Sequence, residues 1–155
     1  FTECSGGEWS KAWPDSWAWT VRTLVIGSVR HWARGVLMWN LALDESYGPR
    51  LGGCGNCRGV VRIDSKTGQV TRNPEYYALG HASRFVEQGA WRIASTSTPG
   101  GIETVAFLNP GGTRVLLAFN AGAGGQAFAV EADGRRFAYT LPPGAAVTFR
   151  WRAPR

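Results

Sequence analysis

The sequence contains one near-continuous apolar run, Val36-Leu37-Met38-Trp39-Asn40-Leu41-Ala42-Leu43. A run of this kind is typical of a strand that is buried on both faces of a parallel sheet. The segment before it predicts a helix: Pro14 and Asp15 suit a helix start, and Gly35 suits a position just past a helix end. Apolar residues recur between them at helical spacing. With an extended N-terminal segment in front, the pattern predicts a strand, helix, strand unit.

The next part of the chain, residues 45–89, predicts a loop, a hairpin and a short helix. A Gly-rich loop carries Cys54 and Cys57, and the hairpin covers residues 60–71 with its turn at 66–68. The helix is expected to start at Pro74 and to stop at Gly89, with Glu75 in its first turn to complement the helix dipole.

Residues 90–151 form a third zone of short segments with alternating apolar and polar residues, separated by Gly, Pro and Asn turns. Alternation points every second side chain to one face of a strand, so the zone predicts an antiparallel sandwich of about five or six strands. The side chains expected to be buried on that face are Phe128, Val130, Phe137, Tyr139, Leu141, Val147, Phe149 and Trp151. The boundary with the first two zones is expected near Gly89.

Composition and charge exclude several classes of protein. The chain of 155 residues is 44% apolar and 18% charged, which is too rich in core-forming residues for a disordered chain. No run of 18 apolar residues exists, so no membrane span is expected. The net charge of +6 comes from 17 basic residues scattered along the chain, with only Arg135 and Arg136 adjacent. This scatter argues against nucleic acid as a partner, because such binders concentrate basic groups on one face.

A single strand, helix, strand unit cannot bury both faces of its sheet, so it either packs on the rest of the chain or belongs to a larger parallel structure. We expect the second, because the sequence opens at Phe1 without a Met or a leader segment and so has the character of a fragment. In a barrel built of such units, catalytic groups lie at the C-terminal ends of the strands. Glu3, Trp39 and Asn40 occupy such positions.

Four motifs together resemble the C-terminal part of glycoside hydrolase family 30, which includes glucosylceramidases and endo-β-1,6-glucanases. The motifs are Phe1-Thr2-Glu3, Trp39-Asn40-Leu41-Ala42-Leu43 followed by Gly48-Pro49, residues 73–85 (NPEYYALGHASRF), and Val147-Thr148-Phe149-Arg150-Trp151. The resemblance implies an α/β plus all-β fold. Residues 1–88 would be units seven and eight of a (β/α)8 catalytic barrel, and residues 89–155 an antiparallel β-sandwich. The missing N-terminal part of the barrel would be a partner.

The resemblance also implies a retaining β-glycosidase with Glu3 as its nucleophile. Trp39 would line the sugar pocket, with Asn40 as a partner for a sugar hydroxyl. On its own, a lone Glu is more often an exposed surface residue, and a Trp in an apolar run is more often core. A retaining enzyme needs a second carboxyl group about 5–5.5 Å from the nucleophile. In the family this group ends the fourth strand, outside this sequence. Glu8 and Asp15 are expected to be solvated loop residues, so the isolated chain is expected to be inactive.

The pair Cys54 and Cys57 could be a redox pair, half of a metal site or a disulfide. Zinc needs four ligands, and Cys4, His31 and His81 lie at no paired spacing with these two. A redox motif would stand at a helix start, whereas glycines surround this pair. We therefore expect a small-loop disulfide in a secreted protein, a free thiol at Cys4, structural roles for both histidines, and no cofactor or metal.

Two functions remain open. The first is a piece of a β-glycosidase acting on a β-glucoside, either a glucan or a glycolipid. The second is a non-catalytic carbohydrate-binding or scaffold sandwich, which would need an exposed row of aromatic side chains on one face. The aromatic residues of the sandwich alternate as if buried, which favours the enzyme.

Overall fold

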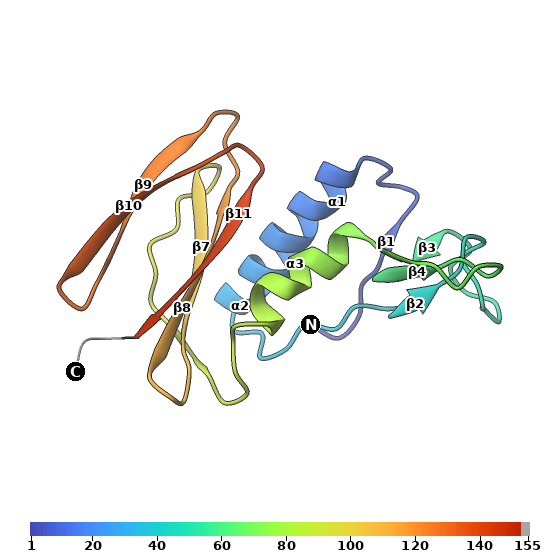
Figure 1. Ribbon diagram of the computed structural model, residues 1–155, viewed down its shortest axis with the longest axis horizontal. Coiled ribbons are helices and arrows are strands. Elements are labelled where there is room, and N and C mark those ends of the chain that lie inside the picture. Colours follow the sequence, from blue (N-terminus) through green and yellow to red (C-terminus); the bar gives the residue numbers. More distant parts are fainter. Residues whose placement is uncertain (153–155) are drawn as a thin grey trace. The chain divides into compact units, whose positions relative to one another are not determined.

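The computed structural model describes residues 1–152, and the chain divides into two compact units, Phe1–Gly80 and a second unit that begins at His81 (Figure 1). The division falls inside helix α3 (Pro74–Ser83). Across the described residues, no helix combines the length and the apolar character that crossing a bilayer would require.

The first unit carries the predicted helix as one continuous helical stretch of three pieces. These are α1 (Trp13–Trp19), the π-helical η1 (Thr20–Gly27) and α2 (Ser28–Arg30). Pro14 lies in the first turn, where a missing N–H costs nothing. The buried face of this stretch is formed mainly by Val21, Leu24 and Val25. The helix prediction is confirmed in type and place.

The end of this helix differs from the prediction. Trp32 adopts the left-handed conformation, with φ of 72°, that was expected of Gly35. The Ala33 N–H bonds to the Ser28 carbonyl at 2.9 Å, and the Trp32 N–H bonds to the Val29 carbonyl at 3.0 Å. This pair of bonds is a Schellman motif, which satisfies the last carbonyls of the helix. The helix therefore stops earlier than the glycine signal indicated.

The apolar run 36–43 is a strand only at its end, and the prediction of a strand buried on both faces is wrong. Strand β2 (Ala42–Leu43) pairs in parallel with β4 (Val61–Ile63), which pairs with β5 (Val70–Arg72) as the predicted hairpin. Leu37 and Leu41 are 58% and 73% exposed. Backbone bonds join Leu37 and Trp39 to residues 1 and 4, and Asn40 and Leu41 to residues 60 and 61, while only Ala42 and Leu43 pair as a strand.

A second small sheet joins β1 (Gly6–Gly7) to β3 (Cys57–Arg58) in antiparallel register. A disulfide links Cys54 to Cys57, the first residue of β3, and Cys4 is a free thiol. The short sheet thus ties the segment after Glu3 to the disulfide loop.

Thiol counting checks the cysteine states in the protein as it is isolated. Under denaturing, non-reducing conditions we expect one reactive thiol, Cys4, and three after reduction. Replacing Cys54 and Cys57 by Ser should change the free energy of unfolding by less than roughly 3 kcal/mol, the value expected for a 15-residue loop, because the loop closed here is much shorter. Three reactive thiols before reduction would contradict the disulfide.

Helix α3 starts at Pro74 as predicted but ends at Ser83, before Gly89. The backbone that follows is held by Asn109, a buried side chain of the second unit. Its Oδ1 accepts the N–H of Glu87 at 3.0 Å, and its Nδ2 donates to the Phe85 carbonyl at 2.9 Å. These bonds replace the helical ones, which is why the predicted helix end is wrong.

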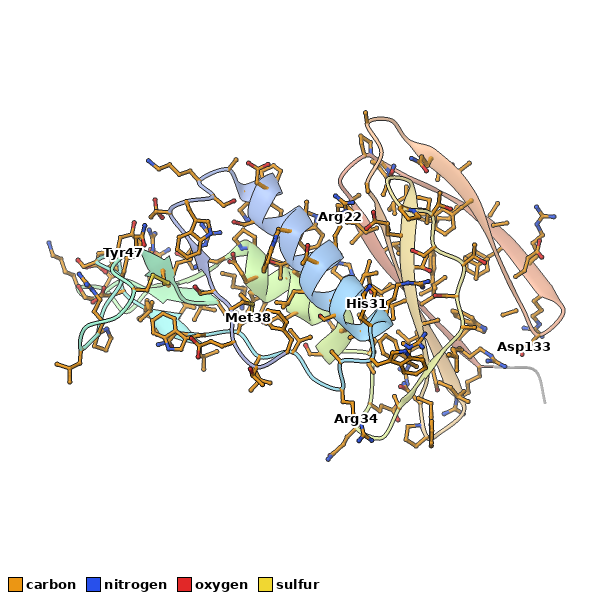
Figure 2. All side chains as sticks on the ribbon, turned by 180° about the vertical axis from the view of Figure 1, so that it is seen from behind. Arg22, His31, Arg34, Met38, Tyr47 and Asp133 are labelled. Carbon is orange, nitrogen blue, oxygen red and sulfur yellow. A yellow bond between two sulfur atoms is a disulfide. The ribbon has the colours of Figure 1, made fainter. Side chains whose placement is uncertain are left out.

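The second unit is an antiparallel sandwich. Four strands form one sheet in the order β11-β8-β7-β6, from Ala146–Arg152, Thr113–Asn120, Ile102–Leu108 and Trp91–Ile93. Strands β9 (Gln126–Ala132) and β10 (Arg135–Leu141) form a separate hairpin with Asp133 at its tip (Figure 2). Ala106, Leu116 and Val130 make the buried cluster, and Phe149 and Trp151 pack on it. Sheet type and strand number agree with the prediction.

Two of the aromatic residues expected in the interior are exposed, and Phe128, Phe149 and Trp151 are partly buried. Phe137 and Tyr139 are 40% and 41% exposed, although their rings pack edge to face against Phe149 at 5.0 and 5.3 Å between centroids. Among the described strands, β10 pairs only with β9 and so forms the edge of a two-stranded sheet. An edge strand covers its side chains on one side only, which explains the exposure.

Candidate functional site

The structure places Glu3 next to the segment that carries Trp39. The N–H of Leu37 donates to the Phe1 carbonyl at 3.1 Å, and the N–H of Trp39 donates to the Cys4 carbonyl at 2.7 Å. The bonds advance in the same direction along both segments, so the segments run parallel. Parallel neighbours present their C-terminal ends at one edge, and Glu3, Trp39 and Asn40 therefore lie at the same edge.

Glu3 itself is exposed. Within residues 1–152, no hydrogen bond or ion pair engages its carboxyl group. A side chain in this state is available to a ligand. Sequence reasoning assigned its role by resemblance, and the geometry adds its location beside Trp39.

Trp39 and Asn40 are both half-buried, and the peptide bond between them is cis. The Oδ1 atom of Asn40 accepts the N–H of Ala42 at 3.1 Å, and the Asn40 carbonyl accepts the N–H of Val60 at 2.8 Å. The backbone of Asn40 is thus held on the side of β4. Its side-chain amide nitrogen can still donate to a ligand.

The segment after Glu3 is packed against several other parts of the first unit. The thiol of Cys4 contacts the sulfur of Met38 at 3.1 Å (Figure 2), and the hydroxyl of Ser5 contacts the sulfur of Cys57 at 3.1 Å. Burial, and secondly the negative charge of Glu75, raise the pKa of the Cys4 thiol. A raised pKa disfavours the thiolate, so Cys4 is a poor nucleophile at neutral pH.

Sequence reasoning missed an ion pair beneath this segment. Glu75 lies in the first turn of α3, where it was expected to complement the helix dipole, and its side chain is also 1% exposed and binds Arg58 at 2.8 Å. Arg58 was assigned no role. The two residues lie 17 positions apart on different elements, and no local pattern connects them.

The two other acidic residues near Glu3 in sequence are placed as follows. Glu8 is half-buried, and its carboxylate accepts a hydrogen bond from the hydroxyl of Tyr47, in the loop after β2 (Figure 2). Desolvation, and then this hydrogen bond, raise the pKa of Tyr47. Asp15 is exposed in the first turn of α1. Asp15 is solvated as expected, whereas Glu8 is engaged with Tyr47.

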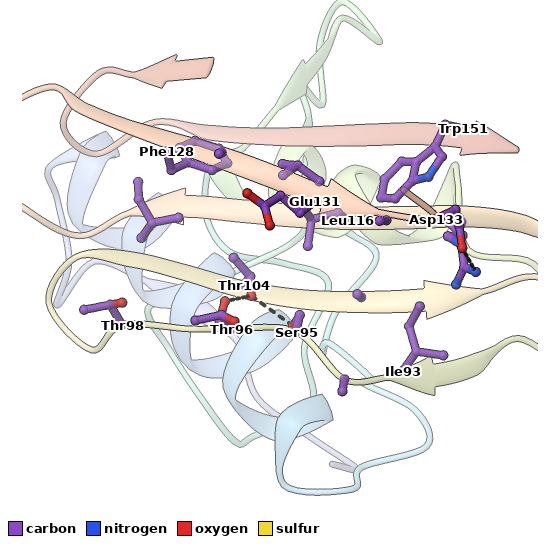
Figure 3. A pocket seen from close by; sticks show the side chains of 17 residues that line it. Ile93, Ser95, Thr96, Thr98, Thr104, Leu116, Phe128, Glu131, Asp133 and Trp151 are labelled. Carbon is purple, nitrogen blue, oxygen red and sulfur yellow. Dashed lines mark hydrogen bonds and ion pairs between the residues drawn. The ribbon is translucent and has the colours of Figure 1, made fainter. Parts of the chain in front are cut away.

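A separate cavity of about 540 Å³ lies in the second unit between the β6–β7 region and β9 (Figure 3). Its wall includes Phe128 and Trp151, together with an ion pair of 2.5 Å between Arg114 and Asp133. Its other carboxylate, Glu131, pairs with Arg136 at 3.3 Å. Both carboxylates are neutralised by arginines, so the cavity lacks a free acid pair for hydrolysis.

Comparison with known proteins gives the following matches. Residues 89–149 match the family model described as the glycosyl hydrolase family 30 beta sandwich domain. The chain is 37% identical over 129 residues to the endo-1,6-beta-D-glucanase BGN16.3 of Trichoderma harzianum, which covers 77% of this chain and 24% of that protein. It is 28% identical over 134 residues to the lysosomal acid glucosylceramidase of Mus musculus, covering 83% of this chain and 25% of that protein.

A solved structure agrees with both units. The endo-beta1,6-glucanase BT3312 superposes with a TM-score of 0.85 and 35% sequence identity, over 98% of this chain and 35% of that one. The chain therefore spans about a quarter of the length of the relatives and about a third of the solved chain.

Proposed function

Because this chain belongs to glycoside hydrolase family 30, we propose that it carries the nucleophile and part of the sugar pocket of a retaining β-glycosidase. One observation carries the proposal: Glu3, Trp39 and Asn40 lie at one edge of two parallel segments, with Glu3 free of partners among residues 1–152. This arrangement offers a carboxylate, an aromatic ring and an amide to the same ligand.

In the proposed reaction a carboxylate oxygen of Glu3 attacks the anomeric carbon of the sugar. The bond from that carbon to the glycosidic oxygen breaks, and a second carboxylic acid donates a proton to the leaving oxygen. In the second half of the reaction, the second carboxyl group, now deprotonated, takes a proton from a water molecule. The water oxygen attacks the anomeric carbon, and the bond from that carbon to Glu3 breaks. Trp39 would stack on the apolar face of the ring, and the Nδ2 of Asn40 would donate to a sugar hydroxyl.

The second carboxyl group is proposed to come from outside this sequence. Glu8 is engaged with Tyr47, and Asp15 stands in the first turn of α1, so neither is offered to Glu3. Residues 1–88 are proposed to be the C-terminal part of the catalytic barrel and residues 89–155 its sandwich domain. The relatives are about four times as long as the matched region, which leaves enough residues in them for the rest of a barrel.

The proposed substrate is a β-glucoside. The relatives named for glucan hydrolysis reach 37% identity over 129 residues, and those named glucosylceramidases reach 34% over the shorter span of 98 residues, which favours a β-1,6-glucan over a glycolipid. Secretion is proposed as well, because disulfides such as Cys54–Cys57 persist in oxidising compartments.

The stereochemistry of the first product tests the mechanism. With the full-length protein and an aryl β-glucoside, proton NMR during the first minutes should show β-glucose, with the α-anomer appearing later by mutarotation. A double displacement inverts the anomeric carbon twice and so retains the configuration. Initial release of α-glucose would rule out Glu3 as a covalent nucleophile.

The alternative function, a non-catalytic carbohydrate-binding sandwich, draws on the exposure of Phe137 and Tyr139. Both rings also pack against Phe149, at interplanar angles of 64° and 81°, so each takes part in the packing of the sandwich. The free carboxyl at Glu3 has no role in a binding sandwich, so we favour the enzyme.

A further inference from the structure

The ion pair of Arg58 and Glu75 is buried beneath the segment that follows Glu3. The Nη2 atom of Arg58 lies 2.8 Å from Oε1 of Glu75, and its Nε lies 3.4 Å from Oε2, so the guanidinium faces both oxygens. Side-chain exposure is 15% for Arg58 and 1% for Glu75. Replacing a buried pair of this kind by apolar residues is often neutral or stabilising, so fold stability alone does not explain it.

The guanidinium also binds the loop between Glu3 and α1. Its Nη1 donates to the carbonyls of Gly7 and Ser10 at 3.5 and 3.3 Å, and its Nη2 donates to the hydroxyl of Ser16. That hydroxyl in turn contacts Ser10 at its carbonyl and its side chain. One side chain on β3 therefore joins α3, the loop and α1.

Glu75 is in direct contact with the same loop. A Cβ atom placed on Gly6 would lie 2.1 Å from Oε1 of Glu75, so the backbone of the loop rests against the carboxylate. On the other side, the Cys4 carbonyl accepts the N–H of Trp39. The chain just after Glu3 is held between these contacts.

We propose that Arg58 and Glu75 are positioning residues, which hold the segment after Glu3 so that its carboxylate stays directed at the anomeric carbon. This inference rests on the proposed function of Glu3. Neither residue reaches the sugar; both act through the backbone of residues 4–10. A displacement of about 1 Å at a reacting group can cost about a hundredfold in rate, so a slack loop would slow attack by Glu3.

The test uses the full-length protein and an activated 2-deoxy-2-fluoro-β-glucoside. This probe measures the first step alone, because the glycosyl-enzyme that it forms is hydrolysed slowly. Its good leaving group also needs little general acid catalysis. The double variant R58M/E75M removes both charges while keeping two long apolar side chains, so folding should survive. We expect its labelling rate constant per active site to fall by about tenfold to a hundredfold, with the inhibitor affinity within about threefold of wild type.

Three comparisons make the result decisive. R114M/D133N removes a second arginine–carboxylate pair, in the sandwich, and should label at the wild-type rate. If R58M/E75M fails to fold, R58K replaces it, because lysine keeps the positive charge but lacks the several fixed N–H donors of the guanidinium. The R58K protein should be labelled several-fold more slowly than wild type. Mass spectrometry locates the label. If the wild-type protein is labelled at a residue other than Glu3, the proposed function is overturned. If Glu3 of folded R58M/E75M is labelled at the wild-type rate, this inference alone is overturned. Where the double variant does not fold, labelling of Glu3 in R58K at the wild-type rate has the same meaning.

Discussion

Replacing Glu3 by Gln in the full-length protein is expected to lower kcat on an aryl β-glucoside by about a thousandfold or more. The amide is nearly isosteric with the carboxylate but cannot form the glycosyl intermediate. Binding of the sugar should change little, because Trp39 and Asn40 remain in place. Initial-rate kinetics give kcat, and the inhibition constant of glucose or a glucan oligomer reports binding.

Glu8→Gln and Asp15→Asn are the matched controls, since they change acidic residues close to Glu3 in sequence that have other positions in the structure. Each should keep kcat within a few-fold of wild type. A loss smaller than tenfold in Glu3→Gln would reject Glu3 as nucleophile.

The isolated 155-residue chain is expected to hydrolyse no aryl β-glucoside above the buffer background. General acid catalysis alone contributes about 10²–10⁴ in rate, and neither Glu8 nor Asp15 is offered to Glu3 as an acid. Positioning of the sugar supplies much of the remaining rate, and most of the pocket is proposed to lie in parts of a barrel outside this sequence. For that reason added azide or formate should not restore turnover.

The full-length protein in the same assay is the positive control for this second experiment, and circular dichroism confirms that the isolated chain is folded. Robust turnover by a folded isolated chain would mean that Glu8 or Asp15 acts as the acid, or that several copies together rebuild the site. Repeating the assay with Glu8→Gln and Asp15→Asn, and over a range of concentrations, would separate these explanations.

The candidate site could be predicted from sequence only in part. Glu3, Trp39 and Asn40 were predicted because a motif resemblance attaches roles to positions, and their common edge follows from parallel pairing across 35 and 36 residues. Arg58 and Glu75 were missed. Whether a charged residue on β3 meets one on α3 depends on how these elements pack, and a helix-start glutamate looks the same in sequence whether it faces solvent or the interior.

The sequence by itself determined the first helix and its start, the hairpin of β4 and β5, the start of α3 and the sandwich, because periodicity, proline and turn residues act on neighbouring residues. Only the tertiary structure decided where the first helix ends, how much of the apolar run 36–43 is paired, and how exposed Phe137 and Tyr139 are. Burial depends on which other segments lie alongside a strand. An apolar side chain favours burial, but the segments that pack beside it determine whether it is buried.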